Sequence, residues 1–200
     1  MLVVGGGVVV NGLASWLVLI HLGLAMIILG FLVATAVMSM PPSPGVPDPR
    51  LRRVAAISVG ATYLLLLTGS TVVASGADRA CRSWPLCGSG LTPDFSGVNA
   101  WTMLHRGSVL VIGALLLFVL LRASRQRGLR AVSIATLSVL ALQVAVGGGA
   151  AVTDFGLFNG LHVGLATLVW AGVLTTALLT VPRTDRDAHR SSVAMEKRTA

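Results

Sequence analysis

The stretch SGADRACRSWPLCGSGLTPDFSGVNAWTMLHR, residues 75–106, is the one long polar interruption between apolar segments of this 200-residue chain. It holds both cysteines, two of the four tryptophans and a His-Arg pair that enters the next apolar segment. The whole chain is 54% hydrophobic and 11% charged, which leaves too little polar surface to cover a soluble globule. The sequence therefore predicts an all-α, polytopic transmembrane helix bundle with this stretch at one end.

The apolar segments around this stretch are long enough to cross a bilayer as helices, which takes about 20 residues. We expect five full spans, none of which contains Asp, Glu or Lys, at residues 16–40, 54–74, 101–121, 131–152 and 158–181. Residues 1–12 are also apolar, but at about 1.5 Å of rise per residue they can form only a half-span.

Positive charge predicts the orientation of the spans. Only Arg79, Arg82 and Arg106 lie at the end that holds the cysteines, whereas the other 12 of the 15 Lys and Arg flank the opposite ends or lie in the C-terminal tail. Because cytoplasmic loops retain positive charge, we expect a multi-pass plasma-membrane protein with the Cys loop outside and the basic loops and C-terminus in the cytoplasm. Contact with lipid headgroups explains the net charge of +8 better than nucleic-acid binding, since no aromatic residues interleave the basic ones.

Two glycine triplets indicate an internal repeat. The segment VVGGGVVVNGLASWLVLIHLGLA near the start matches VAVGGGAAVTDFGLFNGLHVGLA near the end, so that His21 and His162 occupy corresponding places. Duplicated membrane bundles often carry their sites at corresponding positions of the two halves. Chance similarity among Gly, Ala, Val and Leu is the plain alternative.

The repeat suggests part of a duplicated four-helix-bundle architecture, in which the first copy lacks the two spans that precede the second triplet. We therefore divide the chain into a remnant of the N-terminal half (1–40), a Pro-rich cytoplasmic linker (41–53), a C-terminal four-helix half (54–181) with its outer Cys loop (75–100), and a disordered cytoplasmic tail (182–200).

Three histidines share one depth in the spans. His21, His105 and His162 each follow the expected outer end of their span by four or five residues. Ionisable groups in hydrocarbon are costly and usually functional, and two imidazoles at one height on different helices can bind a haem iron from opposite faces. His105 and His162 form the best pair because both belong to the complete half. The alternative is that each histidine only hydrogen-bonds a neighbouring helix.

The outer loop offers two further candidates. Arg106 follows His105 directly, and its guanidinium could bind a haem propionate or extend to water; the sequence favours neither. Cys81 and Cys87 enclose five residues of an exported loop, and two thiolates cannot complete a zinc shell, so a disulfide is the better interpretation. That disulfide could be a structural staple, which is slightly favoured, or a redox-active dithiol.

The pattern SGADRACRSWPLCGSG, the downstream HRG and the repeated glycine-plus-LH segments together resemble the heme A synthase family of cytochrome oxidase assembly, over about residues 1–182. The resemblance implies eight transmembrane helices in two halves and an oxidoreductase that converts the C8 methyl of heme O to the formyl group of heme A. It implies haem b as cofactor, ligated by His105 and His162, with His21 helping to hold the substrate haem in the other half. Cys81 and Cys87 match the family's outer-loop pair.

The chain departs from that pattern in its first half. The family carries there a second Cys loop and a Glu three residues before a His-Arg pair, the proposed catalytic acid, and neither is present; Thr102 stands at that spacing before His105. We therefore expect the N-terminal two to three helices to be missing, and the catalytic residue is unknown. A partner, a second copy of the chain or an upstream segment would have to supply the carboxylate.

The leading interpretation is thus a heme A synthase-like protein, whose partners would be membrane lipid, haem, the farnesyltransferase that makes heme O and terminal oxidase assembly factors, with no nucleic acid. Whether this chain alone is an enzyme is left open. One alternative is a bis-His haem b module that binds haem or transfers electrons without oxidising a methyl group. Another is a transporter or scaffold in which the histidines only pack.

Overall fold

Helices make up most of the part of the chain that the structure describes. The computed structural model describes residues 15–41, 48–88, 92–153 and 156–182. Within these ranges the chain forms five long helices and one short one and no strand: α2 (Ser15–Met38), α3 (Pro49–Ala74), α4 (Ala77–Ala80), α5 (Asn99–Ala123), α6 (Arg130–Val152) and α7 (Gly156–Leu179). The five long helices are long and apolar enough to cross a membrane, which confirms the predicted all-α transmembrane class.

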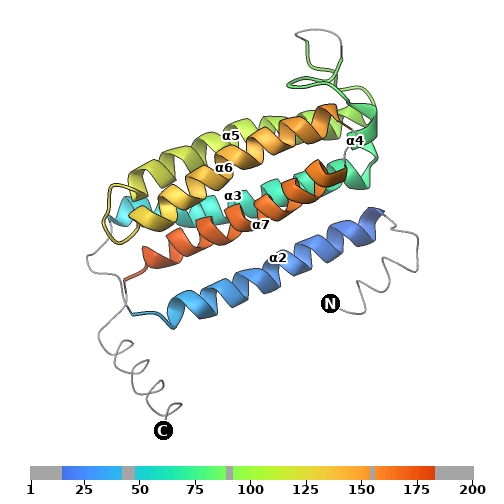
Figure 1. Cartoon of the computed structure of the whole chain (residues 1–200). Helices are drawn as coiled ribbons and strands as arrows, with labels where there is room; N and C mark the ends of the chain where they lie inside the picture. The colour runs from blue at the N-terminus through green and yellow to red at the C-terminus, as the bar shows by residue number, and fades with distance from the viewer. Residues whose placement is uncertain (1–14, 42–47, 89–91, 154–155, 183–200) are drawn as a thin grey trace.

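Four of the long helices form a bundle. α3, α5, α6 and α7 are arranged as a ring in which each packs against two neighbours, so that α5 and α7 stand diagonally opposite each other (Figure 1). α2 lies outside this ring, along the side formed by α3 and α7. The predicted half-span at 1–12, residues 42–47 of the linker and nearly all of the tail fall outside the described residues.

One helix boundary differs from the expectation by more than two residues. α3 begins at Pro49, five residues before the predicted span, so the end of the predicted linker is helical and Arg52 and Arg53 lie on the first two turns. The Asp48 carboxylate accepts the backbone N–H of Arg50 at 2.9 Å, and proline at the first helical position lacks only an N–H that would be unpaired there anyway. Capping chemistry thus starts the helix before the apolar run does.

The bundle core fills the half of the ring away from the Cys loop. One layer joins α3, α5, α7 and the residue before α6, and it consists of Leu51, Ala55, Val119, Ala123, Leu129 and Ala177. The next layer joins α5 and α7, and it consists of Leu116, Leu120, Val169 and Val173. Between α6 and α7, a β-carbon added at Gly172 would overlap the Thr136 side chain, so the two helices approach closely there. Small residues of this kind let membrane helices approach closely.

Two aromatic side chains attach α2 to the ring. Trp170 on α7 donates its indole N–H to the carbonyl of Met26 at 3.0 Å, and Tyr63 on α3 donates its hydroxyl to the carbonyl of Gly23 at 3.3 Å. The two rings also contact each other, with centroids 5.7 Å apart. Both donors therefore bond backbone carbonyls of α2 rather than its side chains.

Replacing Trp170 with Phe should weaken the attachment of α2, because the indole bond is lost while most of the ring remains. We expect the free energy of unfolding to fall by about 0.5–1.5 kcal/mol, measured by SDS titration of purified protein in mixed micelles. Trp16→Phe is the matched control, since Trp16 is 63% exposed. Equal unfolding midpoints for the two variants would contradict the role given to Trp170.

Candidate functional site

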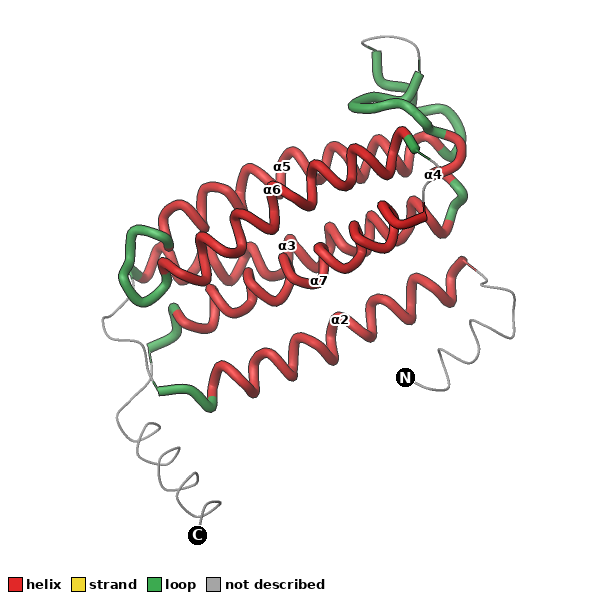
Figure 2. Tube along the Cα trace, viewed as in Figure 1, coloured by secondary structure: helices red, strands yellow, loops and turns green. Residues whose placement is uncertain are grey.

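The Cys loop joins the end of α3 to the start of α5 (Figure 2), and the three membrane histidines lie near the first residues of α2, α5 and α7. His21, His105 and His162 are each the seventh residue of their described helix, counted from Ser15, Asn99 and Gly156. All three are half-buried. The structure therefore places the predicted ligands at one height, above the apolar layers of the core.

His105 packs against the backbone of α3. Its Nδ1 lies 3.0 Å from the hydroxyl oxygen of Thr68, and its Cε1 would stand 3.0 Å from a β-carbon added at Gly69. One residue of α3 thus supplies a hydrogen-bond partner and the next supplies the room for the ring. Any larger residue at position 69 would have to displace the imidazole.

His162 packs in the same manner against α6. Its Cε1 would lie 2.6 Å from a β-carbon added at Gly147, a distance that real β-carbons do not reach, so only glycine accommodates this ring position. The Gln143 amide nitrogen lies 3.4 Å from His162 Nε2. His162 Nδ1 and the Gln143 carbonyl oxygen are both buried without a hydrogen-bond partner.

The chemistry of these two side chains suits a haem, since imidazole is a common ligand of haem iron. They come from α5 and α7, the diagonal pair of the ring, and each is the seventh residue of its helix. Each presses on a glycine of a neighbouring helix, and one has a buried ring nitrogen left unpaired. No group of three His, Cys, Asp or Glu side chains converges within the described ranges, but a porphyrin supplies four iron ligands and needs only two from the protein.

His21 stands apart from this pair. It lies on α2, which packs on α3 and α7 from outside the ring, and its Nδ1 is also buried without a hydrogen-bond partner. His21 and His162, which correspond in the predicted repeat, share that feature. The structure therefore places His105 and His162 on helices of the ring and His21 on the helix outside it.

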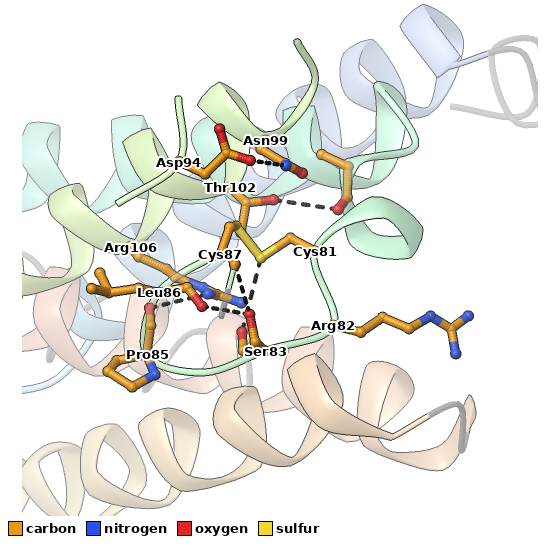
Figure 3. The surroundings of a disulfide bond; sticks show 12 residues. Cys81, Arg82, Ser83, Pro85, Leu86, Cys87, Asp94, Asn99, Thr102 and Arg106 are labelled. Atoms are coloured by element: carbon orange, nitrogen blue, oxygen red, sulfur yellow. Dashed lines mark hydrogen bonds between the residues drawn. A yellow bond between two sulfur atoms is a disulfide. The ribbon is translucent and has the colours of Figure 1, made fainter. Parts of the chain in front are cut away.

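The Cys loop packs on the end of the bundle near which His105 and His162 lie. A disulfide joins Cys81 and Cys87, as predicted from the sequence, and both cysteines are buried against Met103 of α5 (Figure 3). Inside the loop, Ser83 donates its hydroxyl to the carbonyl of Leu86 at 2.6 Å and accepts the N–H of Gly88 at 3.2 Å. These bonds give the loop a fixed shape.

Two contacts attach this loop to the bundle. Arg106 on α5 donates from Nη1 to the carbonyl of Pro85 at 3.0 Å (Figure 3). The Trp84 indole lies over Gly148 on α6, 3.7 Å from where a β-carbon would stand. From the sequence, Arg106 has two candidate partners, a haem propionate and water. The structure adds a third role, which is to attach the Cys loop to α5 beside His105.

Polar side chains also order the segment that leads into α5. The Asp94 carboxylate accepts the N–H of Ser96 at 2.8 Å and the amide of Asn99 at 2.7 Å. Hydrogen bonds from Ser96 and Asn99 hold the pKa of the Asp94 carboxyl below its ordinary value, because they stabilise the ionised form. The carboxylate therefore remains charged at neutral pH and holds the start of α5.

Sequence reasoning found the histidines but missed their neighbours. The sequence alone assigns no part in the site to Thr68, Gly69, Gln143 or Trp84. Gln143 did carry a signal, since it is an amide side chain inside an apolar span, four residues before the first glycine of the second triplet. The others could not be assigned without knowing which helix faces meet.

Comparison with known proteins gives the family. The chain matches the family described as cytochrome oxidase assembly protein (COX15-CtaA) over residues 3–174. It is 33% identical to the heme A synthase of Symbiobacterium thermophilum over 133 residues, which cover 60% of this chain and 41% of that protein.

Two shorter matches involve proteins with a different name. The chain is 28% identical over 114 residues to protoheme IX farnesyltransferase 1 of Natronomonas pharaonis, covering 57% of this chain and 24% of that protein. It is 37% identical over 51 residues to a protoheme IX farnesyltransferase of Haloquadratum walsbyi, covering 26% and 11%. This chain thus spans less than half the length of each of these relatives, and no solved structure matches it.

The family match covers most of the chain, including all three histidines and both cysteines. The resemblance first drawn from the Cys loop and the glycine-histidine repeat is confirmed at the level of the family. The chain belongs to the cytochrome oxidase assembly protein family that its similarity to heme A synthase had indicated.

Proposed function

We propose that this chain is the haem b-binding half of a heme A synthase-like membrane oxidoreductase, which converts the methyl group of heme O to a formyl group during heme A biosynthesis. The observation that carries the proposal is the placement of His105 and His162 on diagonal helices, at one height, each against a glycine. Family membership and the heme A synthase relative support the choice of reaction.

His105 and His162 would hold the haem b iron. When bound, haem b would supply one-electron transfer. The apolar layers of α5 and α7 below the two histidines would keep water out of this part of the bundle. His21, outside the ring on α2, would contact the substrate haem.

The surroundings of this half follow from the same proposal. The Cys loop would face outward and the basic ends would lie in the cytoplasm, where Arg52, Arg53 and Arg122 meet anionic lipid. Similarity to parts of two proteins named protoheme IX farnesyltransferase supports a partnership with the enzyme that makes heme O. Terminal oxidase assembly would consume the product.

A second candidate is a bis-His haem b module that transfers electrons without oxidising a methyl group. One observation favours it, which is that the five long helices contain no Asp or Glu. A carboxylate for methyl oxidation would have to come from a partner, a second copy or another segment.

Co-expression with the heme O-producing farnesyltransferase, in a host without its own heme A synthase, separates the two candidates. We expect heme A in haem extracts analysed by mass spectrometry. A folded, haem-loaded protein that yields no heme A would support the electron-transfer module instead.

Alanine substitutions test the ligands. His105→Ala and His162→Ala should each abolish the low-spin haem b spectrum, because a six-coordinate iron loses one of its two protein ligands. His21→Ala should retain it, because His21 lies outside the ring. The measurement is the ultraviolet-visible spectrum and haem content of protein purified in detergent, and haem retained by both of the first two variants would refute the assignment.

Gly147→Ala tests the space that His162 occupies. The added methyl would lie 2.6 Å from the ring, so the imidazole must move and haem affinity should fall by about 10-fold or more. Gly164→Ala on α7 is the matched control, since a β-carbon there has nothing within 4 Å. Equal haem affinity in the two variants, measured by haem titration, would show that the ring does not depend on this glycine.

A further inference from the structure

The environments of the two haem-site histidines differ at one hydroxyl group. His105 Nδ1 faces the Thr68 hydroxyl at 3.0 Å. The same hydroxyl lies 2.8 Å from the carbonyl oxygen of Leu65, one turn earlier on α3, and donates to it. A threonine hydroxyl has one proton to donate and two lone pairs.

This geometry decides the direction of the bond to His105. The Leu65 carbonyl can only accept, so when Thr68 donates its one proton there, its oxygen accepts from Nδ1 and both contacts are satisfied. Nδ1 must then carry the ring proton. In a neutral imidazole this leaves the lone pair on Nε2, the other nitrogen of the ring.

We propose that Thr68 is the positioning residue of the candidate haem site: it holds His105 as the Nδ1–H tautomer and turns Nε2 toward the iron. This inference rests on the proposed haem-binding function. Metal-ligating histidines commonly donate their second N–H to an oxygen acceptor, which fixes the ring and makes it a stronger electron donor. Gly69, the next residue on α3, gives the ring the space to reach that acceptor.

His162 has no such partner. Its Nδ1 is buried without a hydrogen bond, and its Nε2 instead faces the Gln143 amide nitrogen at 3.4 Å, which can only donate. A haem that binds this nitrogen must displace Gln143. His105 is therefore the preset, stronger ligand, and His162 is the weaker one.

Three variants of the full chain test the proposal. Thr68→Val keeps the shape of the side chain and removes the acceptor, and Thr68→Ser restores the acceptor. Thr71→Val is the matched control, since the Thr71 hydroxyl donates in the same way to a carbonyl of α3, that of Leu67 at 2.9 Å, and not to a histidine. Each variant is purified in detergent, and haem b is titrated into the haem-free protein.

The measurements are haem affinity and the reduction midpoint potential of the bound haem. For Thr68→Val we expect the dissociation constant to rise about 10- to 100-fold and the potential to rise, because a weaker donor stabilises ferric iron less. Thr68→Ser and Thr71→Val should match the parent in both.

The outcomes separate this inference from the proposed function. If His105→Ala and His162→Ala lose haem while Thr68→Val matches the parent in affinity and potential, the role of Thr68 is refuted and the haem site stands. If haem remains in both alanine variants, the haem site itself is refuted. If Thr71→Val moves the potential as far as Thr68→Val does, the effect belongs to α3 in general, and the proposal also fails.

Discussion

The close approach of an imidazole ring to a glycine backbone is the contact on which the site depends. It occurs twice, between His105 and Gly69 and between His162 and Gly147, and in each case the ring and the glycine belong to neighbouring helices of the bundle. A bilayer offers no hydrophobic force to press helices together, so small residues that admit close packing decide where they meet. The same glycines that bring the helices together therefore set the height and direction of the two rings.

The elements of the fold could be predicted from the sequence to within a few residues, because a bilayer requires long apolar helices and ends them at prolines, arginines and polar loops. The depth of each histidine along its helix could also be predicted, because it is counted from the end of the apolar segment. Which side of each helix faces its neighbours could not be predicted. Every side of α5 and α7 is apolar, since lipid and protein interior have similar polarity, so no periodicity tells which residues turn inward. Thr68 and Gln143 could not be paired with their histidines for that reason.

The cysteine pair suggests redox chemistry, but the contacts of the Cys loop show a structural attachment to α5 and α6. Its disulfide is buried against Met103, and its attachments run through Arg106 to α5 and through Trp84 to α6. Arg106 is the residue after His105, so the loop acts on the same turn of helix that presents the ligand. A loop fixed in this way limits rotation of α5 about its axis, and with it the direction in which His105 points.

The attachment of α2 has a consequence for how this part of the chain tolerates change. Trp170 and Tyr63 donate to the carbonyls of Met26 and Gly23, and a carbonyl is the same whatever side chain its residue carries. Most positions of α2 can therefore accept substitutions among apolar residues of similar size without losing these bonds. Gly23 and Gly30, which let the aromatic rings approach, are the exceptions. Apart from His21, sequence variation along α2 should therefore be lowest at Gly23 and Gly30.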